Sequence, residues 1–120
     1  MLPKRIDESG FIWINTNMPH FKYDHERREE KMPQFKILEV KGRDGEKVRK
    51  IGLIGLLTED KGLYHEGAFG GATIEPVVDT AIKFKTMLEK EHGCDLVVPL
   101  THQVRVSIIW SQYLVSQYVV

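Results

Sequence analysis

The sequence is poor in cysteine and has no apolar leader at its amino terminus. Cys94 is the one cysteine among 120 residues, which excludes an internal disulfide and favours a reducing compartment. Cys94 begins an apolar run, so we expect it to be buried rather than reactive. Residues 1–8 (MLPKRIDE) contain no apolar h-region of a signal peptide, and we expect a cytoplasmic location if the chain stands alone.

Neither sign of charge is in excess. The 17 basic and 17 acidic residues give a formal net charge of +0, which argues against general attraction to nucleic acid or to an anionic membrane. Residues 24–31 (DHERREEK) mix both signs, a pattern typical of a solvated loop or short helix. Residues 104–120 are apolar but include Arg105 and several serines and glutamines, so they are a poor membrane span. We therefore expect no nucleic-acid partner and no membrane partner.

The spacing of apolar residues predicts strands in the first half of the chain. Residues 11–14 (FIWI) form a continuous apolar run that is typical of a strand covered on both faces. Residues 35–41 and 48–57 flank the turn formers of residues 42–45 (GRDG), and this arrangement predicts a β-hairpin. The glycines within residues 51–57 (IGLIGLL) would let a neighbouring element pack closely against the sheet.

A helix and a further strand are predicted after a Gly-rich loop at residues 58–74. Pro76 suits the first turn of a helix, and Gly93 suits the position after its end. Between them, apolar side chains three or four residues apart form one helical stripe. Its members are Val77, Ala81, Phe84 and Leu88, widened by Val78 and Ile82. Residues 96–100 (LVVPL) predict a buried strand, so the segment from residue 51 to residue 100 forms one βαβ unit of an α/β layered domain.

Three polar segments follow predicted strands. They are residues 15–17 (NTN), 58–60 (TED) and 101–103 (THQ). In open α/β sheets, ligands bind beyond the carboxyl ends of the strands. His102 directly follows a buried strand, and imidazole is both a common metal ligand and a common general acid or base. From position alone, a functional role and a surface or capping role both stay open for His102.

Four segments follow one another in an order known from one protein family. They are residues 13–18 (WINTNM), 51–60 (IGLIGLLTED), 74–81 (IEPVVDTA) and 94–103 (CDLVVPLTHQ). In sequence and spacing they resemble a strand, a second strand with its loop, the start of the next helix, and a strand ending in a metal-binding histidine. The set resembles calcineurin-like metallophosphoesterases of the 5′-nucleotidase type, and the order of the segments carries the resemblance more than any one of them.

The resemblance implies a fold and a chemistry. In that family, two divalent ions such as Mn, Zn or Fe lie between the two sheets of a four-layer αββα sandwich. They activate water for attack on a phosphate ester or nucleotide. The strand-end histidine of the family corresponds to His102, so the resemblance implies that His102 is a ligand of one metal. Asn17 does not correspond to the family's metal-binding asparagine, which belongs to a G-N-H motif.

The other metal motifs of the family do not occur in this sequence. No D-x-H, G-D or G-N-H precedes His102, and no G-H-x-H or G-H-x-Q follows it. One histidine cannot form a two-metal site, because each ion needs several protein ligands. We therefore expect residues 1–103 to be a partial metallophosphoesterase domain that is inactive alone, with a divergent apolar tail at residues 104–120. The alternative is a non-catalytic α/β interaction module that associates with itself through its C-terminal strand.

The remaining histidines carry weaker predictions. His20 and His25 are five residues apart, which is not the one-turn spacing of a helical metal pair, although with Asp24 they could bind a metal loosely. His65 lies in the Gly-rich loop and could approach a substrate, although loop histidines are usually solvated. His92 falls in the last turn of the predicted helix, where a capping role is expected.

Two further features of the Gly-rich loop have plain structural interpretations. Residues 67–71 (GAFGG) lack the Lys and Ser/Thr of a P-loop, so we do not expect them to cradle a phosphate. Glu59 and Asp60 are acidic residues directly after a strand, and we expect them to form a turn.

Overall fold

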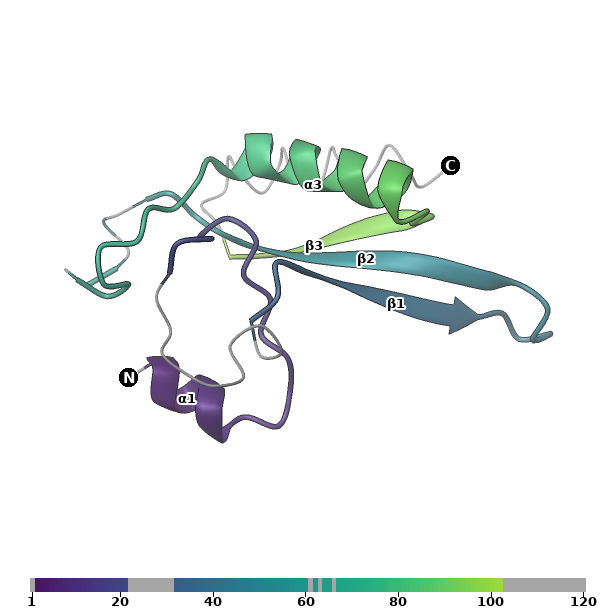
Figure 1. The fold of residues 1–120 in the computed structure, drawn as a ribbon, viewed down its shortest axis with the longest axis horizontal. Helices are drawn as coiled ribbons and strands as arrows, with labels where there is room; N and C mark the ends of the chain where they lie inside the picture. Colours follow the sequence, from purple (N-terminus) through teal and green to yellow (C-terminus); the bar gives the residue numbers. More distant parts are fainter. Residues whose placement is uncertain (1, 22–31, 61, 63, 66, 103–120) are drawn as a thin grey trace.

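A computed structural model shows a mixed α/β chain with a three-stranded sheet (Figure 1). The structure describes residues 2–21, 32–60, 62, 64, 65 and 67–102. Its elements are α1 (Leu2–Glu8), β1 (Phe35–Lys41), β2 (Val48–Leu57), α3 (Val77–Glu91) and β3 (Leu96–His102). No helix in these ranges is both long and apolar enough to cross a membrane. Residues 24–31, predicted to be a solvated loop or short helix, and the predicted tail at residues 104–120 lie outside the described residues.

The predicted hairpin is confirmed. Strands β1 and β2 pair antiparallel, from Phe35 opposite Ile54 to Lys41 opposite Val48. The turn closes through Gly42, whose N–H donates to the Lys47 carbonyl at 2.9 Å. Gly45 has a φ of 70°, a backbone conformation that residues with a Cβ rarely adopt. The turn residues of the sequence thus set the register of the hairpin.

The predicted βαβ unit is also confirmed. Strand β3 lies parallel to β2, from Ile51 beside Leu96 to Leu57 beside His102, and α3 connects the two strands. Figure 1 shows α3 lying along one face of the sheet. The sheet order is β1-β2-β3, so β2 is the central strand. The carboxyl ends of β2 and β3 therefore lie side by side at one edge of the sheet.

The helix α3 buries the stripe that the sequence predicts. Val77, Ala81, Phe84 and Leu88 are all buried beneath it, but Ile82 is exposed and does not widen the stripe as expected. Pro76 stands just before the first helical residue, and Gly93 follows the last turn with a φ of 65°. The helix is thus placed by its apolar face and ended by its glycine.

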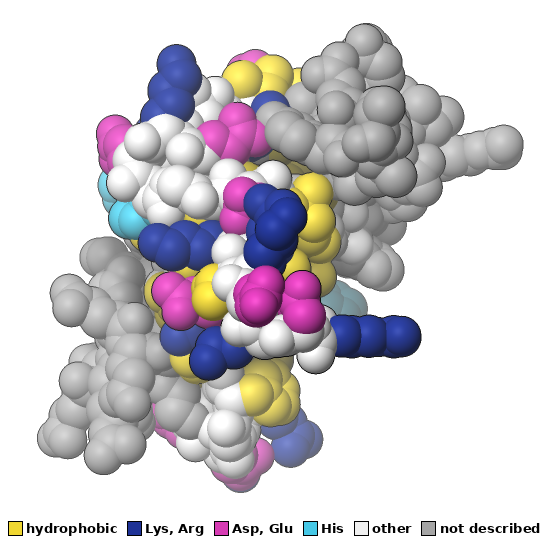
Figure 2. Space-filling view, turned by 90° about the vertical axis from the view of Figure 1, so that its right-hand side faces the viewer, with side chains coloured by type: hydrophobic (Ala, Val, Ile, Leu, Met, Phe, Trp, Pro, Cys, Tyr) yellow, Lys and Arg dark blue, Asp and Glu magenta, His cyan; other side chains and the backbone are white. Residues whose placement is uncertain are grey.

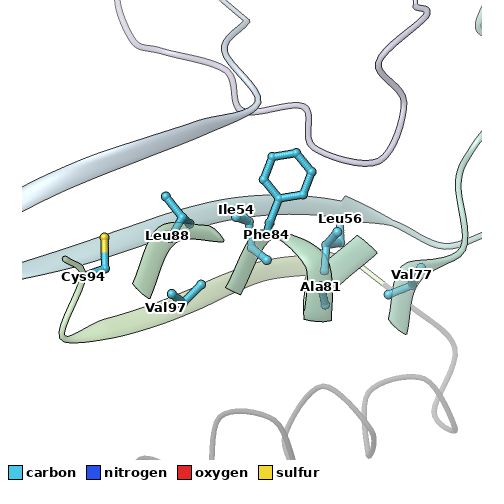
Figure 3. Close-up of a cluster of buried hydrophobic side chains, with 8 residues drawn as sticks. All are labelled: Ile54, Leu56, Val77, Ala81, Phe84, Leu88, Cys94 and Val97. Atoms are coloured by element: carbon cyan, nitrogen blue, oxygen red, sulfur yellow. The ribbon is translucent and has the colours of Figure 1, made fainter. Parts of the chain in front are cut away.

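The main core lies between α3 and the sheet. Its buried side chains are shown in Figure 3: Ile54, Leu56, Val77, Ala81, Phe84, Leu88, Cys94 and Val97. The helix approaches β2 closely at Gly52, where a Cβ would lie 2.9 Å from Leu88 Cδ1 and 3.3 Å from Cys94 Sγ. The expected role of this glycine in close packing and the expected burial of Cys94 are both confirmed.

Cys94 makes the stability of this core depend on pH. Burial raises the pKa of the Cys94 thiol, Asp95 and Glu89 raise it further, and Lys50 lowers it. The folded state therefore holds the thiol proton more tightly than the unfolded chain does. This stabilisation is fully present below the ordinary thiol pKa of about 8.5 and is lost as the pH rises through the folded-state value. We expect wild-type protein to lose more unfolding free energy between pH 7 and pH 10 than Cys94→Ala does.

Urea unfolding of both proteins at the two pH values measures this difference. Cys94→Ala serves as the reference because it keeps the lysines and tyrosines, which also titrate in this range. Equal losses in the two proteins would mean that the thiol is not coupled to folding.

The predicted strand at residues 11–14 was wrong. These residues have no regular secondary structure, and Phe11 is 64% exposed. The Phe11 ring stacks on Trp13 at a centroid distance of 5.6 Å, and Trp13 Nε1 donates to Ser9 Oγ at 2.8 Å. The aromatic residues of this run therefore stack on each other locally. Thr16 and Asn17, which follow the run, form the hydrogen bonds to β2 instead.

A second, smaller core lies at the carboxyl end of β2. Helix α1, which was not predicted, contributes the fully buried Ile6, which clusters with Met18 and Phe21. Leu57 from the end of β2 and Phe69 from the Gly-rich loop pack against this cluster. The N-terminal segment and the loop are therefore joined to the sheet through apolar contacts.

The second face of the sheet is open in the described part of the chain. Side chains alternate across a strand, so Leu38, Val40 and Leu100 point away from α3. All three are exposed, Leu100 by 52%. The α/β class is thus established, whereas the αββα sandwich is not. Toward the hairpin end, Figure 2 shows basic and acidic side chains intermixed on the surface.

Candidate strand-end site

The three polar segments predicted at strand ends meet at one edge of the sheet. Leu57, the last residue of β2, is the register partner of His102, the last residue of β3. Asn17 bonds to the same Leu57 from the opposite side. Thr58, Glu59 and Asp60 follow directly. The sequence therefore predicted correctly that these segments come together, although the first of them does not follow a strand.

Asn17 is an internal clamp. It is 1% exposed. Its Nδ2 donates to the carbonyls of Leu57 at 2.8 Å and Glu75 at 3.1 Å, and its Oδ1 accepts the Leu57 N–H at 2.9 Å. The backbone carbonyl of Asn17 also accepts the Glu75 N–H at 2.6 Å. The side chain thus joins the N-terminal segment to the end of β2 and to Glu75, which lies just before α3. The role of Asn17 is therefore structural.

Thr16 satisfies the edge of β2 just before that clamp. Strand β1 pairs with β2 only as far as Ile54. Beyond it, the Gly55 N–H donates to Thr16 Oγ1 at 2.8 Å, and the Thr16 N–H donates to the Gly55 carbonyl at 3.0 Å. Thr16 Oγ1 in turn donates to the carbonyl of Gln34. Thr16 and Asn17 therefore continue the hydrogen bonding that β1 leaves unfinished.

His102 lies where the sequence predicts, at the carboxyl end of β3. This placement concerns its backbone, and its role as a metal ligand stays a prediction. Within the described ranges, no three His, Cys, Asp or Glu residues gather in a group that could hold a metal ion.

Glu59 and Asp60 hold the backbone, as expected for residues after a strand. Asp60 Oδ1 accepts the Gly62 N–H at 3.0 Å and so forms a turn. Glu59 reaches further than expected, because its Oε1 accepts the N–H of Val77 at 3.1 Å. A carboxylate at this position satisfies a free donor of the first helical turn and complements the helix dipole. Glu59 therefore ties the end of β2 to the start of α3.

A cavity of about 690 Å³ lies within the Gly-rich loop, beyond the end of β2. Its walls include Glu59, Tyr64, His65, Phe69 and Thr73. The Tyr64 hydroxyl donates to the Thr58 carbonyl at 3.1 Å, and the Tyr64 ring meets the Phe69 ring edge-on at 5.0 Å. Sequence reasoning considered His65 but missed the two aromatic residues, although their place in a Gly-rich loop was visible.

No family model matches the chain, and no curated protein does. Its function must therefore be argued from the residues of this edge of the sheet and from the order of its motifs.

The other predicted candidates do not add to the site. His20 is exposed, and His25 and Asp24 lie outside the described residues. His92 is the C-cap residue of α3, as expected, and its ring packs 5.1 Å from that of Phe35. Within residues 67–71, the N–H groups of Ala68 and Gly70 form turns, because they donate to the carbonyls of His65 at 3.0 Å and Gly67 at 3.1 Å.

Proposed function

We propose that the chain is part of a metal-dependent phosphoester hydrolase of the calcineurin-like, 5′-nucleotidase type. In this proposal His102 supplies one ligand to a divalent ion such as Mn, Zn or Fe, and the substrates of the complete enzyme are phosphate esters or nucleotides. The observation that carries the proposal is the position of His102 at the carboxyl end of β3, beside the end of the parallel strand β2.

Two features of the fold support the family. Three of the four segments of the resemblance have the secondary structure that it implies: β2 with its loop, the start of α3, and β3. The open face of the sheet carries exposed apolar residues, including Leu38 and Leu100. A groove of about 350 Å³, lined in part by Ile12, Leu57 and Leu100, lies at the end of that face. Such a face is suited to a second sheet, as in an αββα sandwich.

The chain by itself is not expected to hydrolyse phosphate esters. His102 is the one residue that corresponds to a metal ligand of the family, and the described residues do not form a two-metal centre. What the chain supplies in this proposal is a rigid strand end that fixes the backbone of one ligand. Leu57, which pairs with His102, is itself held by Asn17.

Weak metal binding at His102 can be tested on the chain itself. We expect substoichiometric Mn²⁺ to broaden the backbone NMR signals of Leu57, Thr58 and Thr101 before those of α3, because these residues surround the proposed ligand. A lone imidazole binds such an ion weakly, and paramagnetic broadening detects weak binding. The variant His102→Ala is expected to lose the broadening.

His65→Ala is the matched control, since it removes an imidazole from the same end of the molecule and should leave the broadening unchanged. Broadening that persists in His102→Ala would contradict the assignment and favour the alternative, a non-catalytic interaction module. The coding DNA upstream of Met1 offers an independent test. In-frame D-x-H, G-D and G-N-H motifs there would support the proposal, and their absence from every frame and exon would argue against it.

A further inference from the structure

The loop cavity has the size and walls of a small-molecule site. Its volume of about 690 Å³ falls within the roughly 300–1,000 Å³ of typical ligand pockets. Tyr64 and Phe69 provide aromatic walls, and Ile74 adds apolar surface. The cavity lies beyond the end of β2.

The aromatic walls are held in place from behind. The hydroxyl of Tyr64 is fixed by the Thr58 carbonyl, and its ring is braced by Phe69. Phe69 in turn meets the ring of Phe21 edge-on at 6.1 Å, and Phe21 belongs to the buried second core. The walls are thus largely preformed, which lowers the entropy cost of binding a ligand.

The polar groups of the cavity favour a positive charge. Glu59 is exposed at the wall and uses Oε1 to cap α3. No other hydrogen bond of Glu59 occurs in the described part of the chain, so Oε2 is available to a ligand. Asp60 lies close enough to raise the pKa of Tyr64, after the larger effect of burial. Among the described wall residues, Glu59 is the one carboxylate and His65 the one basic side chain, and no lysine or arginine is present.

We propose that this cavity binds a small organic cation that carries an aromatic ring, such as an arylamine or arylamidine. The ring packs against Tyr64 and Phe69, and the cationic nitrogen donates to the free oxygen of Glu59. Aromatic faces attract cations, and a hydrogen bond between two charged groups is stronger than one between neutral groups. The inference is independent of His102 and of phosphoester hydrolysis.

Benzamidine, benzamide and benzoate test the proposal, because they share one ring and differ in charge. Titrations of the full chain are followed by the NMR signals of residues 67–74. We expect benzamidine to shift these signals and to bind about fivefold more tightly than benzamide, a ratio typical of one exposed charge pair. Benzoate is expected not to bind.

Glu59→Gln is the decisive variant. Glutamine keeps an oxygen for the Val77 N–H and removes only the charge, so the cap of α3 is retained. We expect benzamidine affinity to fall about fivefold and benzamide affinity to stay the same. Glu91→Gln, an equal change of charge at the far end of α3, is the control and should leave both affinities unchanged.

Three results would overturn the proposal. They are equal affinity for benzamide and benzamidine, an equal loss of benzamidine affinity in Glu91→Gln and Glu59→Gln, and loop signals that do not respond to benzamidine in the millimolar range. Tyr64→Leu provides a second check, because it removes an aromatic wall and should weaken both benzamidine and benzamide. A melting temperature close to that of the wild type shows that a variant is folded.

Discussion

Replacement of Asn17 by alanine is expected to lower the free energy of unfolding by about 3–4 kcal/mol. The substitution removes three side-chain hydrogen bonds at a position that is 1% exposed. It leaves the N–H and carbonyl of Leu57 and the carbonyl of Glu75 without these partners in a part-buried setting, and the loss of each partner costs about 1–3 kcal/mol. Urea unfolding followed by circular dichroism measures the change.

Asn15→Ala is the control for Asn17→Ala. The side chain of Asn15 makes hydrogen bonds with nearby Met18, and Asn15 is less buried than Asn17. We expect it to cost about 1 kcal/mol, as for a local turn or cap. If the two substitutions cost the same, the hydrogen bonds that Asn17 makes across the fold would not be what stabilises this edge of the sheet.

Replacement of Gly55 by alanine is expected to cost about 3 kcal/mol, at the upper end for an overpacked site. A Cβ at Gly55 would overlap the carbonyl oxygen of Ile14 and lie 3.1 Å from its carbonyl carbon. These are backbone atoms. Thr16, two residues after Ile14, is held to Gly55 by two hydrogen bonds. The N-terminal segment cannot move away without losing those bonds. Thermal and urea unfolding measure the loss.

Gly52→Ala makes the same chemical change on the opposite face of β2. There the new Cβ would meet the end of the Leu88 side chain at 2.9 Å, and a side-chain end can adjust. We expect a cost of about 1 kcal/mol, since overpacking is partly offset by the smaller entropy of the unfolded chain. A larger cost at Gly52 than at Gly55 would contradict the close approach of Ile14.

Local signals in the sequence predicted most of the sheet and its helix. The turn at residues 42–45 and the alternation beside it defined the hairpin, and the stripe from Val77 to Leu88 defined α3. These features depend on neighbours within one or two turns of the chain. The run at residues 11–14 misled the prediction, because an apolar run reports burial and β-propensity but not whether a partner strand is free to receive it.

The site was predicted less completely, for a physical reason. The position of His102 follows from the strand before it, so the sequence was sufficient. The role of Asn17 depends on Leu57 and Glu75, which are 40 and 58 residues away. The cavity depends on turns that bring Tyr64 toward Phe69. Contacts of this kind leave no periodic pattern in the sequence.

The Asn17 clamp also sets an order for folding. The hairpin closes a short turn between adjacent strands, whereas the clamp must close loops of 40 and 58 residues. Loop closure costs entropy that grows with the length of the loop, and contacts distant in sequence slow folding. The hairpin can therefore form early, and the clamp locks only after β2 and the approach to α3 are in place. A contact that forms after the folding transition state mainly slows unfolding and has little effect on the rate of folding, so the hydrogen bonds of Asn17 mainly prolong the lifetime of the folded state.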